Sequence, residues 1–189
     1  MKTHFSKAIK LTFLLIVLTV IYTLVIRGIS YLAPGGGDGE KVVNKGNIIG
    51  YYNIGQSFTN DKYFRSRPSA VNYNAAAGAG SNKSPTNPDQ IKIIKARIDT
   101  FLVHNPDISI KDIPSELVTA SGSGLDPDIS PQAAYIQVKR IAKIRKIDEN
   151  ILKTLVEHHI DKPLFGLFGP EKVNVLKLNI ALEEMKCNK

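Results

Sequence analysis

Two serines set among glycines form the part of the chain that most resembles a catalytic or phosphate-binding loop: Ser121, Gly122, Ser123 and Gly124. A phosphate-binding loop of the Walker type ends in Gly-Lys-Ser/Thr, because the lysine reaches phosphate oxygens and the hydroxyl holds the metal ion. No such ending follows here. A hydrolase that used either serine as its nucleophile would need a histidine and an acid brought near by folding. A turn explains the glycines more simply, since glycine takes positive φ without strain.

Two carboxylates follow these residues and flank a proline: Asp126 and Asp128. We expect them to form a turn, with their side chains accepting backbone N–H bonds ahead of a helix. Attraction of a cation at the domain surface is the alternative. Together with the serines and glycines, the two aspartates make up a candidate interaction loop. Arg65 and Arg67 lie among aromatic residues, where packing or a salt bridge is expected in preference to anion binding.

The histidines and the single cysteine do not indicate a metal or catalytic site. His158 and His159 are adjacent, so on a helix they point about 100° apart and do not chelate one ion together. His158 and Asp161 are better spaced, but two ligands do not make a metal site. Cys187 lies in a polar C-terminal segment with no histidine nearby in sequence. The sequence therefore predicts no metal and no firmly bound cofactor, and it indicates an accessory or binding protein that is not an enzyme by itself.

An uncharged apolar run near the N-terminus must position everything that follows it. No charged residue lies between Lys10 and Arg27. A helix over residues 11–33 would be about 34 Å long, enough to span a hydrocarbon core of about 30 Å. Lys2 and Lys7 add to the positive charge before the run, which favours a cytoplasmic N-terminus. A cleaved signal peptide is the alternative, but the run is long for one and no small-x-small cleavage site follows closely.

The predicted fold class is a single N-terminal transmembrane helix plus a mixed α/β extracytoplasmic domain. The expected parts are a cytoplasmic N-terminus over 1–10, a transmembrane helix over 11–33, a flexible tether over 34–46 and an extracytoplasmic α/β domain over 47–189. The net charge is +8, but beyond residue 33 the chain holds 21 basic and 17 acidic residues. That excess is too small to suggest nucleic acid as a partner. One cysteine excludes an intrachain disulfide.

Apolar spacing and turn residues predict the elements of the domain. We expect strands at 48–54 and 116–120 and an irregular stretch at 72–88. Helices are expected to begin at Asp89, Ser130, Asp148 and Asn174, with Asp89 as the N-cap of the first and a strand as the alternative for 173–180. Ser130 precedes a proline, which is typical of a helix start. The positions expected to be buried on these helices are Ile91, Ile94, Ile98, Phe101, Leu102, Ala134, Val138, Ile141, Ala142, Ile151, Leu152, Leu155, Val156, Leu178, Ala181, Leu182 and Met185. Lys139, Lys143 and Lys146 form the opposite, solvated or partner-facing side of the second helix.

Four segments carry a resemblance to a known family. They are IGQSFTNDKYFRSRPSA (54–70), GAGSNKSPTNP (78–88), PSELVTASGSGLDPDISPQAA (114–134) and EKVNVLKLNIAL (171–182), with Gln137, Arg140 and Arg145 at familiar spacing. With the N-terminal membrane helix, they resemble the KdpC family, the C subunit of the bacterial high-affinity potassium-transporting ATPase. The resemblance covers nearly the whole chain in order. Asp128 departs from it, because the family commonly has histidine there, so the role of that histidine does not carry over.

The resemblance implies a subunit in a bacterial inner membrane that works with KdpA, KdpB and KdpF. KdpA selects potassium, the transported ion, and KdpB is the P-type ATPase that binds and hydrolyses ATP. Two roles are implied for the C subunit, namely stabilisation of the assembly and a chaperone function that raises the ATP affinity of KdpB, with Gln137 at the position implied for nucleotide contact.

The charge bias bears on these two roles, because it exports residues 34–189 while ATP lies in the cytoplasm. We therefore expect a structural cap over the mouth of KdpA. A free-standing membrane-tethered solute-binding protein is the remaining alternative.

Overall fold

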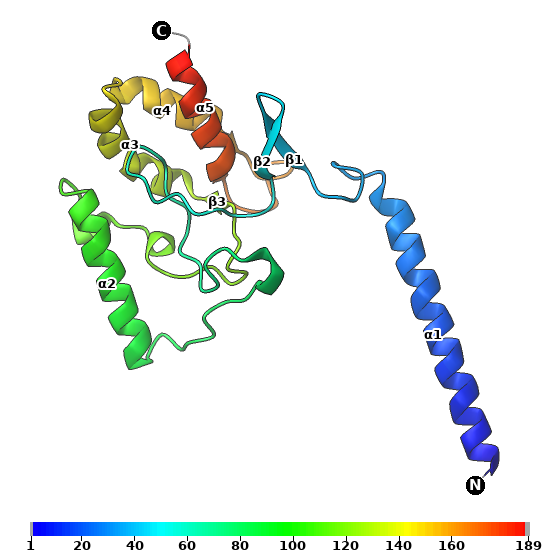
Figure 1. Cartoon of the computed structure of the whole chain (residues 1–189). Helices are drawn as coiled ribbons and strands as arrows, with labels where there is room; N and C mark the ends of the chain where they lie inside the picture. Colours follow the sequence, from blue (N-terminus) through cyan, green and yellow to red (C-terminus); the bar gives the residue numbers. More distant parts are fainter. Residues whose placement is uncertain (1, 188–189) are drawn as a thin grey trace. The chain divides into compact units, whose positions relative to one another are not determined.

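The computed structural model describes residues 2–187 (Figure 1), and the chain divides into two compact units, Met1–Lys41 and Val42–Lys189. The first unit is built on α1 (Lys2–Ser30), a helix long and apolar enough to cross a membrane, with a mean hydropathy of 2.5 over an 18-residue window. The helix begins before the expected span, and it ends at Ser30 rather than at residue 33. Turns follow it because Pro34 and the glycines after it do not favour a helix.

A hairpin of two short strands opens the second part of the chain: β1 (Lys41–Asn44) and β2 (Asn47–Tyr51). The residues between them, Lys45 and Gly46, have φ values of 50° and 81°. Positive φ at both central residues is the turn that matches the twist of paired strands. β2 overlaps the expected strand region, whereas β1 lies inside the segment that we expected to be a flexible tether. The irregular part is therefore shorter than predicted.

The next helix, α2 (Pro88–His104), begins one residue earlier than expected. Its cap is Asn87, whose Oδ1 accepts from the backbone N–H of Asp89 at 2.9 Å, so the prediction of Asp89 as the cap was wrong. A short 3₁₀ turn, η1 (Ala75–Ala77), lies in the preceding stretch, which is otherwise irregular as predicted. Of the five expected apolar positions on α2, only Phe101 is fully buried. α2 therefore contributes little to the core.

The expected strand at 116–120 was wrong. A 3₁₀ turn, η3 (Ser115–Leu117), overlaps this region, and another, η2 (Ile110–Asp112), precedes it. The backbone N–H of Leu117 donates to Pro114 O at 3.0 Å and that of Thr119 to Ser115 O at 2.9 Å, so local bonds satisfy the chain without a neighbouring strand. Leu117 and Val118 are nevertheless buried, which is what their apolar character predicted.

The rest of the domain packs three helices with a small antiparallel sheet. The helices are α3 (Pro131–Arg145), α4 (Glu149–His158) and α5 (Val175–Cys187), and the strands are β3 (Asp128–Ile129), β4 (Ile160–Asp161) and β5 (Lys172–Asn174), in the order β3-β5-β4. Ile129 and Ile160 both pair with Val173 across the central strand. Both readings of 173–180 are partly right, because β5 ends at Asn174 and α5 starts directly after it.

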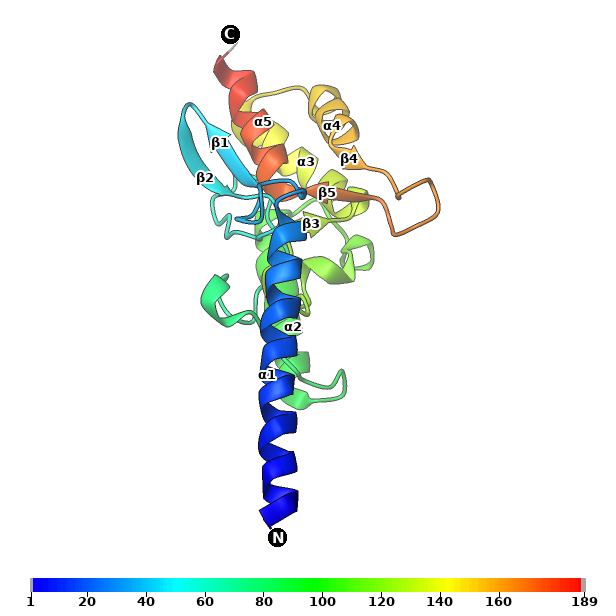
Figure 2. The ribbon, with the colours of Figure 1, turned by 90° about the vertical axis from the view of Figure 1, so that its right-hand side faces the viewer.

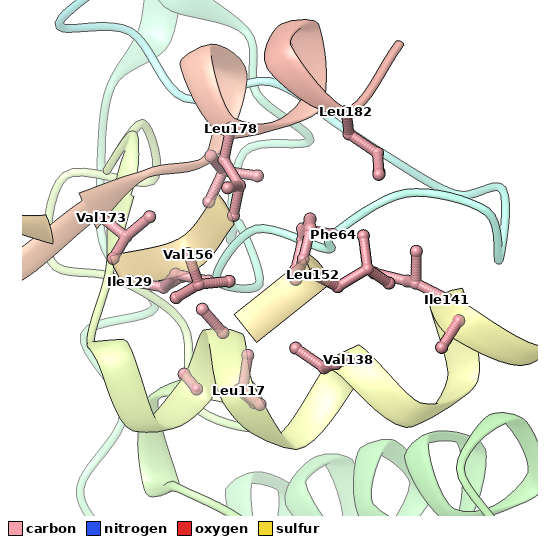
Figure 3. Packing of buried hydrophobic residues seen from close by; sticks show 14 of the residues in the cluster. Phe64, Leu117, Ile129, Val138, Ile141, Leu152, Val156, Val173, Leu178 and Leu182 are labelled. Carbon is pink, nitrogen blue, oxygen red and sulfur yellow. The ribbon is translucent and has the colours of Figure 1, made fainter. Parts of the chain in front are cut away.

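The predicted helix starts of this part are confirmed. Ser130 Oγ accepts from the backbone N–H of Ala133 at 3.1 Å, and Asn174 Oδ1 accepts from that of Lys177 at 3.1 Å. The core is a single cluster contributed mainly by α3, α4 and α5, to which the segment around Phe64, the strands β3 and β5, Leu117 and Phe101 also belong (Figure 3). Ile151 is the exception among the expected core positions of α4, since its side chain is 51% exposed. A long apolar N-terminal helix followed by a mixed α/β domain is the fold class that the sequence predicted.

Candidate functional site

The serines of the candidate interaction loop (residues 121–128) make contacts that hold the loop in place. Ser121 is buried, and its backbone N–H donates to Pro68 O at 3.1 Å. Ser123 Oγ accepts from the backbone N–H of Leu125 at 3.1 Å, which closes the turn. Neither hydroxyl is paired with a histidine in the described chain, so the arrangement does not activate a nucleophile.

Gly124 ties this loop to the stretch that precedes α2. Its φ is +70°, and a Cβ there would lie 2.7 Å from Ala79 O and 2.7 Å from Val71 Cγ2. Its carbonyl accepts from Ser69 Oγ at 2.6 Å. Gly122, by contrast, is open, because a Cβ added there would meet no atom within 4 Å. The glycine at 124 is required by close backbone approach, whereas the glycine at 122 is not.

The two aspartates of the loop are both engaged. Asp126 Oδ1 accepts from the backbone N–H of Asp128 at 3.1 Å, which confirms the predicted turn, and its Oδ2 accepts from Arg67 Nη1 at 2.8 Å. Asp128 Oδ2 accepts from Lys172 Nζ at 2.7 Å. This hydrogen bond raises the pKa of Lys172 above its ordinary value. With their charges paired, the carboxylates are less suited to a free cation than to holding the loop against β5.

Gln137 is fully buried on α3, and both ends of its amide are used. Its Oε1 accepts from the backbone N–H of Arg65 at 2.8 Å and from Arg140 Nη2 at 2.9 Å. Its Nε2 donates to Ala133 O at 3.0 Å and to Arg65 O at 3.3 Å. Nucleotide contact by Gln137 stays a prediction, and this geometry does not favour it because a nucleotide would have to displace these bonds.

An ionic cluster that sequence reasoning missed surrounds Asp61 (the Asp61 cluster: Asp61, Arg65, His104 and Arg140). Asp61 Oδ1 accepts from Arg65 Nη2 at 2.7 Å, which confirms the salt bridge expected for that arginine, and Oδ2 lies 2.8 Å from His104 Nδ1. Arg140 Nη1 lies 3.8 Å from Asp61 Oδ1 and donates to the Asp61 carbonyl.

These contacts shift two pKa values. Burial alone would raise the pKa of Asp61, but the hydrogen bond with His104 and the arginine charges hold it below its ordinary value. Burial and the charge of Arg65 lower the pKa of Arg140 to about 10, against the opposing effect of Asp61.

A second buried arginine fixes the same segment from the end of α3. Arg145 Nε donates to Lys62 O at 2.7 Å, and its Nη2 pairs with Glu183 on α5 at 2.5 Å. Its guanidinium lies over the Tyr63 ring, 5.1 Å from the centroid. The sequence signal for these contacts was the placement of polar residues at helical spacing on the apolar side of α3.

Within the described residues, no group of three or more histidine, cysteine, aspartate or glutamate side chains could hold a metal ion. His159 Nδ1 lies 2.8 Å from Leu155 O, and Asp161 Oδ2 accepts from the hydroxyl of Tyr52 at 2.8 Å. The side chain of Cys187 lies outside the described residues. The structure thus does not bring the histidines, Asp161 or the serines of the interaction loop together.

The loop between β4 and β5 exposes four large apolar side chains (the apolar tip). They are Leu164, Phe165, Leu167 and Phe168, exposed by 64%, 84%, 81% and 66%. The loop closes on itself, because Leu164 and Phe168 pair as an isolated bridge with N–H···O distances of 3.0 Å. Figure 2 shows this loop extending away from the helices of its domain. Sequence reasoning assigned turns here but did not predict an apolar surface.

Comparison with known proteins identifies the family. The sequence pattern of the family described as KdpC, the c chain of the K⁺-transporting ATPase, matches residues 5–184. A potassium-transporting ATPase KdpC subunit of Flavobacterium johnsoniae is 54% identical over 187 residues, covering 98% of this chain and 100% of the relative. The corresponding subunit of Bacteroides fragilis strain YCH46 is 52% identical over 184 residues, covering 95% of this chain and 96% of the relative. That of Caldanaerobacter subterraneus is 42% identical over 192 residues and covers 100% of both chains. The chain therefore belongs to the KdpC family of potassium-transporting ATPase subunits.

Proposed function

We propose that this chain is a non-catalytic accessory subunit of an ATP-driven potassium uptake complex, which it stabilises and covers on the side from which potassium enters. The observation that carries the proposal is the apolar tip. Four large apolar side chains are exposed together on one loop, and exposed apolar patches rimmed by polar residues mark sites of contact. The charges beside the loop have mixed signs, with Lys162 next to Asp161 and Glu171 next to Lys172. Mixed charge around an apolar centre suits a protein interface.

The proposed orientation places the N-terminus in the cytoplasm and the folded domain outside, with residues 11–33 crossing the cell membrane once. The lysines before the apolar run support it. At the other end of α1, Arg27 Nη2 pairs with Asp38 at 3.4 Å. This pairing partly offsets the one positive charge near that end, so the charge difference across the helix remains in favour of a cytoplasmic N-terminus.

The proposed partners are the membrane subunits KdpA, KdpB and KdpF. The domain would lie over the mouth of KdpA, and α1 would pack beside the membrane subunits. No nucleotide contact is assigned to this chain, because Gln137 is buried and its amide is fully bonded. ATP would act through KdpB alone.

The proposal is tested by replacing the centre of the apolar tip with Phe165→Gly and Leu167→Ser together. Phe165 has a φ of 55°, so glycine keeps the backbone without strain. We expect the variant to fold, since these side chains lie outside the core. The amount recovered with the tagged membrane subunits should fall about tenfold, the effect of losing one or two apolar anchors from an interface.

Val103→Ser is the matched control, because Val103 is 77% exposed on α2, away from the loop. It should leave recovery of the complex unchanged. Normal assembly of the Phe165/Leu167 variant would contradict the proposed docking role of the tip.

A further inference from the structure

A cavity of about 420 Å³ lies between α2 and the segment 57–73. Its lining includes three basic side chains, those of Arg65, Arg97 and His104, and all its lining residues belong to the described chain. None of them is an aspartate or a glutamate. The lining of the cavity therefore has basic side chains and no carboxylate.

Arg97 is the residue whose charge is not matched. It projects from α2 and is partly buried, and its Nη1 donates to Val118 O at 3.1 Å. No carboxylate of the described residues lies within 4.0 Å of its guanidinium, unlike Arg65, Arg67, Arg140 and Arg145. Burial lowers the pKa of Arg97, partly opposed by Tyr73. A partly desolvated cation with no counter-charge is costly, and an anion in the cavity would relieve that cost.

The other two basic residues of the lining, Arg65 and His104, share the carboxylate of Asp61, which is not itself a lining residue. Asp61 accepts from Arg65 and His104 and also lies near Arg140, so a single carboxylate serves two arginines as well as the histidine. The Nε of Arg65 is buried and has no hydrogen-bond partner. The Asp61 cluster thus holds more arginine charge than carboxylate charge, and Arg65 belongs both to it and to the cavity lining.

We propose that this cavity binds a phosphate group, carried by a free small molecule or by a lipid headgroup. Arginine suits phosphate because its planar fork donates two parallel hydrogen bonds. Of the hydroxyls that line the cavity, those of Ser66, Tyr73 and Thr100 already donate to backbone carbonyls. The hydroxyls of Ser57 and Thr59 are the ones left as further donors. The rings of Phe58 and Phe101 form an apolar wall for the remainder of the ligand. This site is separate from the apolar tip and does not depend on the accessory role proposed above.

The probe is inorganic phosphate, added to the full chain in nonionic detergent with chloride adjusted to constant ionic strength. Saturating phosphate should raise the midpoint of thermal unfolding by about 2–4 °C, as expected for a ligand that binds the folded state alone. Arg97→Gln should abolish the rise. Arg97→Lys keeps the charge but loses the fork, so we expect about tenfold weaker binding by calorimetry.

Lys95→Gln is the matched control, since it removes one exposed positive charge from the same helix. It should keep the response to phosphate. A general salt effect would raise the unfolding midpoint of every variant alike, so an equal rise in Arg97→Gln, or no rise in the unmodified chain, overturns the proposal. Micelles doped with phosphatidylglycerol distinguish a lipid headgroup from a free phosphate compound. If the natural ligand is a lipid, phosphatidylglycerol should occupy the cavity and abolish the response to phosphate at a concentration far below that of the phosphate.

Discussion

Two buried amide side chains hold one extended segment by its backbone. Asn179 on α5 accepts from the backbone N–H of Phe64 at 2.8 Å and donates to its carbonyl at 2.9 Å. Gln137 on α3 makes the same two contacts with Arg65, at 2.8 and 3.3 Å. Each amide thus makes the two backbone hydrogen bonds that a neighbouring strand would otherwise make with Phe64 or Arg65. Buried peptide groups need such partners, which explains why polar side chains lie among the core helices.

Replacing Gln137 by alanine should therefore destabilise the chain. The change leaves the buried N–H of Arg65 and one donor of Arg140 without a partner, and we expect a loss of about 2–3 kcal/mol. Denaturant unfolding in detergent measures it. Gln132→Ala is the control, because Gln132 is exposed on the same helix, and it should change stability by less than about 0.5 kcal/mol. Unchanged stability of the Gln137 variant together with a weakened response of the complex to ATP would instead favour nucleotide contact.

The sequence could place Gln137 on a helix but could not predict what it binds. Its partner Arg65 lies 72 positions away, and that of Asn179 lies 115 positions away. A polar residue on an apolar helix side gives no information on which distant peptide it will satisfy. The same limit applies to Asp61, whose role depends on residues from α2 and α3.

At the scale of elements, the sequence predicted those features that depend only on residues close together in the chain. The start of α3 followed from Ser130 and Pro131, whose capping contact spans three residues. The strand expected at 116–120 failed because strand formation depends on a partner elsewhere in the chain, and here the 3₁₀ turns satisfy the backbone first. β1 was missed since only its turn, Lys45-Gly46, signals a hairpin. The apolar tip was missed because turn residues predict where the backbone changes direction, but not whether the side chains of the loop are exposed.

The contact between the candidate interaction loop and the stretch before α2 can be tested at the glycines of the loop. Gly124→Ala should destabilise the chain by about 2–4 kcal/mol, because alanine is strained at positive φ and its Cβ would overlap a backbone oxygen. Gly122→Ala, two residues away, adds a methyl group in open space and should be close to neutral. Thermal unfolding of the two variants compares them directly. Equal stability would mean that the loop can move away from the stretch before α2, contrary to its many contacts there.

At the scale of the molecule, a membrane-capable helix and a folded domain follow one another in a single chain. Family membership assigns both to a potassium-transporting ATPase, and the helix limits what the domain can reach. If the domain is exported, it cannot meet ATP in the cytoplasm, and the apolar tip and the phosphate cavity would serve extracytoplasmic partners and ligands. The side of the membrane is thus the property on which the functional roles depend.

The single cysteine of the chain allows that side to be measured. Cys187 lies near the C-terminus, so in outer-permeabilised cells a membrane-impermeant maleimide should label it if the domain is extracytoplasmic. In a Ser6→Cys, Cys187→Ser variant, the only thiol precedes the apolar run and should be labelled only after the inner membrane is opened. Labelling of both in detergent shows that each thiol is reactive. The reverse pattern, with Ser6→Cys labelled and Cys187 protected in closed cells, would place the domain in the cytoplasm. It would remove the cap over KdpA and make nucleotide contact by the folded domain the better account.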